Sequence, residues 1–198
     1  MGRRGGRSRL TPGPARPKRS RAPKPPERPA GAGADDLGAT VDPGDRQLGE
    51  ALGDALAALR RRERTAAELH GWLRGRGVAE EAVEEVLAEL VEIGELDDER
   101  FAFAYAADKR ELAGWGAHRI AAALRERGIG AALAERAAEE SREDELRRAV
   151  GLVRRRGENL EDERGCARSL ALLTRRGYEH ELAYEAVRRA RGEASGAA

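Results

Sequence analysis

The chain has 198 residues and a formal net charge of +1; 37% of its residues are charged and only 4% are aromatic. So few large aromatic side chains disfavour a single deep core, and shallow helical cores of Ala, Leu and Val suit the composition better. One cysteine excludes an intramolecular disulfide and a cysteine metal cluster, and without an apolar stretch of about 20 residues we expect no membrane span and a reducing, cytoplasmic setting.

Residues 1–46 are predicted to form a disordered basic tail. All eight prolines lie at or before Pro43, and residues 1–30 hold ten basic residues and one acidic residue, a net charge of +9 that leaves −8 for the rest of the chain. A segment of Arg, Lys, Pro, Gly, Ala and Ser cannot bury enough apolar surface to offset the entropy of ordering. It also lacks the apolar run of a signal peptide. We expect the tail to add weak, sequence-independent attraction to single-stranded DNA or another anionic surface.

From about residue 47 onward the sequence predicts helices only. Ala, Leu, Glu and Arg dominate this part, and apolar residues recur at spacings of three and four. No segment alternates as a strand does, so the predicted fold class is all-α. The expected helices cover about residues 49–63, 66–76, 80–93, 98–112, 117–127, 131–140, 142–156, 163–176 and 180–191.

A repeated motif divides the helical part into three. Residues 73–77 (LRGRG) reappear as residues 124–128 (LRERG) and 173–177 (LTRRG), at intervals of 51 and 49 residues. Each final glycine follows a helical run, where a left-handed residue is favoured. Periods of this size indicate stacked supersecondary units. We therefore predict three tandem three-helix repeats, residues 47–95, 96–140 and 141–198, forming an elongated curved array without a common core.

The residues that usually carry chemistry do not form a catalytic or ligand-binding pattern. His70, His118 and His180 occupy unrelated positions in the three repeats, and the sequence has neither an HExxH pair nor a phosphate-binding glycine loop. Cys166 stands where the other two repeats have alanine, which favours a small core residue over a reactive thiol. The sequence therefore predicts a binding protein and not an enzyme, with no metal and no cofactor.

The candidates for contact with a partner are Trp115, Arg119, Arg76, Arg127 and Arg176. Trp115 either packs on Ile120 as a hydrophobic staple at a helix start or serves as an exposed anchor for a partner. Arg119 lies on the same first helical turn. The other three arginines align near the ends of the middle helices. There they either complement the helix dipole or form a row that contacts protein or nucleic acid.

The centre of the chain resembles a known family. Residues 94–102 (GELDDERFA) are followed by residues 114–120 (GWGAHRI) and 124–129 (LRERGI). In this order and spacing they resemble the RecX family of bacterial recombination regulators, over about residues 50–191. The resemblance implies three tandem three-helix repeats that bind in the groove of the filament of RecA and single-stranded DNA. It further implies inhibition of RecA's ATP hydrolysis, strand exchange and co-protease activity, and so a role in homologous recombination, DNA repair and the SOS response.

The alternative is a nucleic-acid-binding protein of tandem helix-turn-helix-like units. The net charge of −8 outside the tail weighs against it, because phosphate contact calls for basic surface. The arginine clusters at residues 60–62 and 154–156 favour it. On the RecX resemblance we expect a monomer that contacts the RecA filament, with a weak contact between its basic tail and single-stranded DNA.

Overall fold

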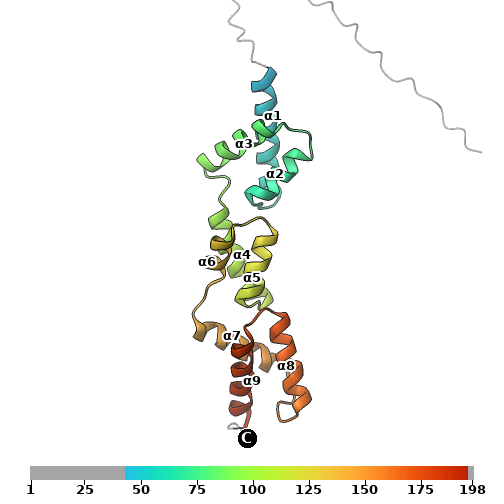
Figure 1. Cartoon of the computed structure of the whole chain (residues 1–198), viewed down its shortest axis with the longest axis vertical. Helices are drawn as coiled ribbons and strands as arrows, with labels where there is room; N and C mark the ends of the chain where they lie inside the picture. The colour runs from blue at the N-terminus through green and yellow to red at the C-terminus, as the bar shows by residue number, and fades with distance from the viewer. Residues whose placement is uncertain (1–42, 196–198) are drawn as a thin grey trace, which may run out of the picture. The chain divides into compact units, whose positions relative to one another are not determined.

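The computed structural model describes residues 43–195, in which all regular secondary structure is helical. The prediction of an all-α fold is confirmed, whereas most of the expected tail lies outside the described residues. Within this range, none of the helices combines the length and the apolar character that a bilayer-spanning segment requires. The helices in Figure 1 are α1 (Pro43–Arg61), α2 (Ala66–Arg74), α3 (Glu80–Glu92), α4 (Asp98–Ala113), α5 (Ala117–Glu126), α6 (Ala131–Ala138), α7 (Arg142–Arg156), α8 (Glu163–Arg175) and α9 (His180–Ser195).

Helix α1 begins at Pro43, earlier than the expected start near residue 49 and inside the segment predicted as tail. Proline is favoured at the first helical position, because its fixed φ suits the helix and its missing N–H would have no partner there. Pro43 therefore opens a helix, although the sequence reading treated it as the last proline of the tail.

Side chains at the helix starts fix where several helices begin. The side chains of Thr65, Asp97 and Ser141 each accept a hydrogen bond from the backbone N–H three residues later. These N–H groups have no partner within the helix, so the caps stabilise the first turn. At Thr65 the backbone N–H in turn stabilises the carboxylate of Glu68, which completes a capping box.

Left-handed glycines end the middle helix of each repeat, as predicted. Gly77, Gly128 and Gly177 have φ values of 85°, 85° and 84°. The residue after each glycine donates its N–H to a carbonyl in the last turn, at 3.1–3.3 Å. This pattern is a Schellman motif, which satisfies carbonyls that would otherwise lack a partner.

Each group of three helices has its own hydrophobic core. Helices α1–α3, α4–α6 and α7–α9 enclose three separate clusters, and we call these groups repeats 1, 2 and 3. The leucine that opens each motif, Leu73, Leu124 or Leu173, is fully buried in its own cluster. For the described residues, the absence of a common core is confirmed.

Repeat 2 contacts repeat 1 where the end of α5 meets the beginning of α2. The hydroxyl of Thr65 donates a 2.6 Å hydrogen bond to the carbonyl oxygen of Arg127. A Cβ added to Gly128 would overlap the Cβ of Ala67, so only glycine allows this approach. We call this contact the first joint.

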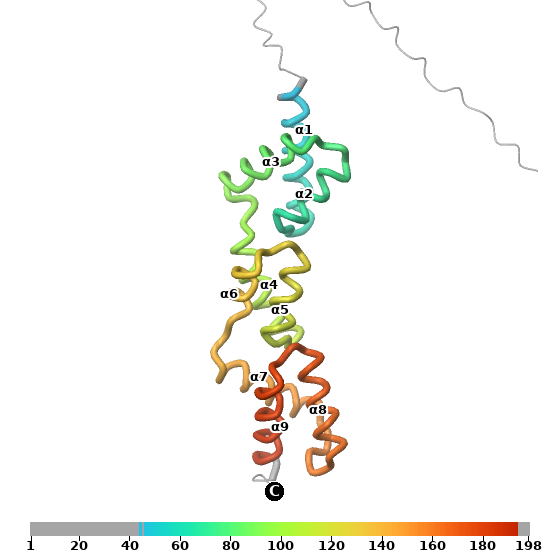
Figure 2. The backbone as a smooth tube through the Cα atoms, viewed as in Figure 1, coloured from blue at the N-terminus to red at the C-terminus, as the bar shows by residue number. Residues whose placement is uncertain are grey.

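Repeat 3 contacts repeat 2 in the same way, where the end of α8 meets the beginning of α5. The backbone N–H of Gly116 donates a 2.8 Å hydrogen bond to the carbonyl oxygen of Arg176. A Cβ added to Gly177 would overlap the Cβ of Arg119. This second joint can be followed along the backbone in Figure 2.

A carboxylate from the following repeat completes both joints. The N–H of Ala66 donates to Asp98 Oδ1 at 2.8 Å, and the N–H of Ala117 donates to Glu145 Oε1 at 3.1 Å. Each N–H belongs to the first residue of a middle helix, where the helix dipole is positive. The chain therefore uses a similar arrangement twice, at the beginning of α2 and of α5, with a side-chain donor in the first joint and a backbone donor in the second.

Candidate partner-binding surface

Arg127 lies at the centre of the first joint. Its Nε and Nη2 donate hydrogen bonds of 2.8 and 2.9 Å to the two carboxylate oxygens of Glu68. The same guanidinium lies 4.4 Å from the ring centroid of Phe101 and 5.4 Å from that of Tyr105. The structure thus brings this candidate arginine against the preceding repeat, where its charge is already paired.

The hydrogen bonds between Glu68 and Arg127 shift the pKa values of both side chains. The hydrogen bond from Arg127 holds the pKa of Glu68 below its ordinary value, although burial acts in the opposite direction. The same hydrogen bond raises the pKa of Arg127. Both side chains are only 22% exposed, so this ion pair is less screened than a typical surface pair.

We expect the Glu68–Arg127 pair to make the first joint sensitive to acid. The pKa of Glu68 in the folded state lies below the 4.5 of a free glutamate. Its contribution to the free energy of unfolding is therefore complete above pH 4.5 and is lost as the pH falls through the folded pKa. Glu68→Gln should lower stability by about 1–3 kcal/mol at neutral pH, and should flatten the acid decline. Urea unfolding at a series of pH values measures both effects.

Glu84→Gln is the matched control, because Glu84 is exposed on α3 and the substitution removes the same charge. Its stability curve should run parallel to that of the unmodified protein. An equally steep acid decline in Glu68→Gln would contradict a role for this carboxylate in the joint.

Trp115 lies between two cations at the start of α5. Lys109 Nζ is 5.2 Å from its ring centroid, and the guanidinium carbon of Arg119 is 4.2 Å from it. The indole is half-buried and packs against the core cluster that contains Ile120, and Gly116 is the N-cap. The indole thus packs as a hydrophobic staple would, yet part of it remains exposed to solvent. Both alternatives, a staple and an anchor for a partner, therefore stay open.

Cation–aromatic contacts form a continuous series in repeat 2. Lys109 Nζ lies 4.9 Å from the ring centroid of Tyr105 as well as beside Trp115. Tyr105 in turn lies next to Arg127. We call the whole series the cation–aromatic ladder, and its members are Phe101, Arg127, Tyr105, Lys109, Trp115 and Arg119.

The sequence reasoning missed three members of the ladder. Phe101, Tyr105 and Lys109 stand at four-residue intervals in α4. That spacing places them on one face of the helix and is the signal from which they could be predicted. Their place beside Arg127 and Trp115 depends on how α4 packs against α5, which spacing alone does not give.

Arg119 connects the ladder to repeat 3. Its Nη1 donates a 2.9 Å hydrogen bond to the carbonyl oxygen of Arg175, while its guanidinium stacks on Trp115. Arg176 lies close by, because its Nη1 would be 3.5 Å from a Cβ added at Gly114. The structure therefore brings three of the candidates, Trp115, Arg119 and Arg176, together at the second joint.

Arg76 occupies the corresponding place in repeat 1 and stands apart from the other candidates. Its guanidinium carbon lies 4.8 Å from the ring centroid of Trp72, and its Nη2 is 2.8 Å from Asp54 Oδ2. Arg64 also stacks on Trp72, at 5.5 Å. Repeat 1 thus has a cation–aromatic group of its own.

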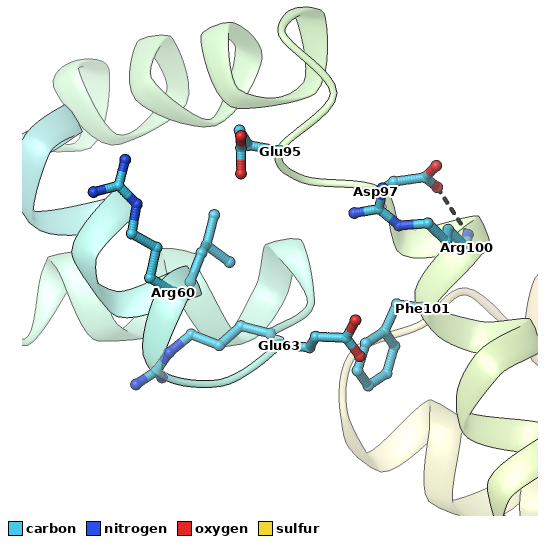
Figure 3. A pocket seen from close by; sticks show the side chains of 8 residues that line it. Arg60, Glu63, Glu95, Asp97, Arg100 and Phe101 are labelled. Atoms are coloured by element: carbon cyan, nitrogen blue, oxygen red, sulfur yellow. Dashed lines mark hydrogen bonds between the residues drawn. The ribbon is translucent and has the colours of Figure 1, made fainter.

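A hollow of about 150 Å³ lies between repeats 1 and 2 (Figure 3). Its lining mixes charges of both signs with two apolar side chains, and consists of Leu59, Arg60, Glu63, Arg64, Glu95, Asp97, Arg100 and Phe101. The Nε of Arg64 is buried and has no hydrogen-bond partner among the described residues. Because Phe101 and Arg64 line the same hollow, it connects the ladder with the cation–aromatic group of repeat 1. Such a lining suits a polar segment of a partner.

Comparison with known proteins identifies the family. The family model for the second three-helix domain of RecX matches residues 97–137, and that for the first three-helix domain matches residues 51–90. The regulatory protein RecX of Mycobacterium sp. (strain JLS) is 40% identical over 144 residues, which is 67% of this chain and 76% of that protein. The chain belongs to the RecX family.

A second RecX protein supports this assignment, and a solved RecX structure shares the fold. The regulatory protein RecX of Mycobacterium ulcerans (strain Agy99) is 36% identical over 155 residues, 75% of this chain and 87% of that protein. The crystal structure of RecX from Lactobacillus salivarius has a TM-score of 0.66, with 18% identity, and covers 73% of this chain and 97% of that one. At that identity the likeness shows a shared fold. The RecX resemblance of residues 94–129 is therefore confirmed, and the matched ranges fall in repeats 1 and 2.

Proposed function

We propose that this RecX-family protein is a regulator, mainly an inhibitor, of the RecA recombinase. In this proposal it binds as a monomer, in the cytoplasm, to the filament that RecA forms on single-stranded DNA. The observation that carries the proposal is the match of repeats 1 and 2 to the RecX family models, together with the similarity of the chain to regulatory RecX proteins.

We propose that the second joint provides a main part of the contact with RecA. Trp115, Arg119 and Arg176 lie together there, and Arg119 is exposed. Arginine side chains are enriched among the residues that dominate binding energy in protein interfaces, so we propose that Arg119 and Arg176 make this contact, with Trp115 as the packed support beside them. The action proposed is binding alone, without a reaction catalysed by this chain.

A second candidate function is direct binding of nucleic acid. The ladder favours it, since alternating cations and aromatic rings occur on surfaces that bind single strands. Against it, cations already lie over the rings of Tyr105 and Trp115, so a base would have to displace them to stack. Filament binding therefore remains the preferred proposal.

The purified protein is expected to suppress the DNA-dependent ATP hydrolysis of RecA while hydrolysing no ATP itself. Titration at a fixed RecA concentration, with single-stranded DNA first limiting and then in large excess, separates the two candidates. Binding to the filament predicts inhibition that persists in excess DNA. Inhibition that disappears in excess DNA, with matching affinity for naked DNA, would instead support the nucleic-acid-binding alternative.

A further inference from the structure

The two joints show what covers the glycine turn at the end of a middle helix. In both, the beginning of the preceding repeat's middle helix lies on the turn, Ala67 against Gly128 and Arg119 against Gly177. The carbonyl just before each glycine accepts a hydrogen bond from the N-cap residue of that helix. Within this chain, the turn is therefore a docking surface for a helix N-terminus.

Repeat 1 has the same turn without such a cover. Gly77 has the same left-handed conformation, and Val78 donates to the carbonyl of Leu73 just as the corresponding residues do in the other repeats. No heavy atom of the described residues lies within 4 Å of the place where a Cβ on Gly77 would be. The turn that a helix start approaches closely in repeats 2 and 3 is thus without such a neighbour in repeat 1.

In repeat 3, the place at which the glycine turn of a following repeat would dock is closed by the chain itself. Gly165 stands in the sequence register of Thr65 and Gly116, the N-caps that take part in the joints, although in the structure it is the third residue of α8. A Cβ on Gly165 would overlap the carbonyl oxygen of Asn159, so the segment between α7 and α8 fills the place that a following repeat would need. A second copy of the chain could not dock this first turn of α8 on Gly77 without displacing that segment.

We propose that the turn formed by Arg76, Gly77 and Val78 docks the N-terminus of a helix on the regulated partner protein. The first joint defines the helix that fits, with a small residue at the place of Ala67 and a carboxylate at the place of Glu68. The positive end of such a helix would face the negative end of α2. Arg76 can donate hydrogen bonds to the new carboxylate. Its present ion pair with Asp54 is half exposed, and such pairs contribute little to stability, so exchanging the partner costs little. The inference rests on the proposed function, in which the partner is the RecA filament.

Gly77→Ala tests the inference, with Gly157→Ala as its matched control. Gly157 is also left-handed, with φ 70°, and likewise has no heavy atom within 4 Å of an added Cβ among the described residues. Both alanines impose similar backbone strain, so both variants should lose similar thermal stability. Only the methyl group at Gly77 projects from the open turn. The midpoint for inhibition of RecA ATP hydrolysis should rise about tenfold for Gly77→Ala and stay within about twofold for Gly157→Ala.

Arg76→Glu, with Arg61→Glu as control, tests the charge of the turn independently. Arg61 is exposed in the last turn of α1, so both substitutions make the same change of charge near a helix end. Only Arg76→Glu is expected to weaken inhibition. If the unmodified protein inhibits RecA and both turn variants inhibit equally well, the docking site is refuted while the proposed function stands. A protein that does not inhibit at all would refute both. Sedimentation that shows a dimer lost in Gly77→Ala would identify a second copy as the occupant and overturn the proposal.

Discussion

Gly116→Ala is expected to open the second joint and to lower the free energy of unfolding by about 3 kcal/mol. The φ of Gly116 is −84°, so alanine meets no backbone strain there. The new Cβ would instead lie 2.6 Å from the carbonyl oxygen of Gly177 and 2.7 Å from the backbone nitrogen of Tyr178. Backbone atoms cannot move aside as a side chain can, so repeat 3 must shift and the bond from Gly116 to Arg176 weakens. Urea unfolding followed by circular dichroism measures the loss.

Gly130→Ala separates this clash from the general effect of replacing a glycine N-cap. Gly130 is the N-cap of α6, with φ −58°, no capping side chain and open space around an added Cβ. Its replacement should change stability by no more than about 0.5 kcal/mol. Equal losses in the two variants would mean that Gly116 matters only as a helix cap, and that the close approach of repeat 3 is unimportant for stability.

Trp115→Ala is also expected to cost about 3 kcal/mol of stability, because the indole packs on the core of repeat 2 and between two cations. Inhibition of RecA per folded molecule should remain close to that of the unmodified protein, since Lys109 and Arg119 already lie against the ring. Thermal unfolding and the ATPase titration, done below the unfolding range of the variant, give the two readings.

The opposite pattern would identify Trp115 as an anchor. In that case stability changes little, and binding weakens by about 2 kcal/mol or more, as interface aromatics do on truncation. Leu112→Ala serves as the control in α4, because this side chain is 85% exposed and its loss should affect neither reading.

The features that depend on a few neighbouring residues could be predicted from the sequence. The cap at Thr65 and the left-handed turn at Gly128 follow from local rules, and both are present. The pairing of Arg127 with Glu68 joins residues 59 positions apart and was not predicted. The helix dipole alone explains why an arginine stands near the C-terminal end of a helix. Nothing in the sequence therefore indicated that Arg127 pairs with a residue of another repeat.

The glycines illustrate the same limit. The sequence predicted the conformation of Gly77, Gly128 and Gly177 from their place after a helix, and could not distinguish among them. In the structure, Gly128 and Gly177 are also places of close contact, whereas the turn at Gly77 is open. That difference comes from packing between repeats, and the α1 start at Pro43 shows that even a local boundary can be hidden by a proline-rich context.

The separation of the three cores has a consequence for how the protein forms during synthesis. Since the packing of each core involves only the three helices of its own repeat and the residues directly beside them, we expect a repeat to collapse once this segment has left the ribosome. The residues of repeat 2 that form the first joint are synthesised after repeat 1, in their order along the chain. Asp98 emerges just after repeat 1 is complete, whereas Arg127 follows only near the end of α5. We therefore expect each finished repeat to serve as the template on which the next one docks, so that assembly runs from the N-terminal to the C-terminal repeat as the chain is made.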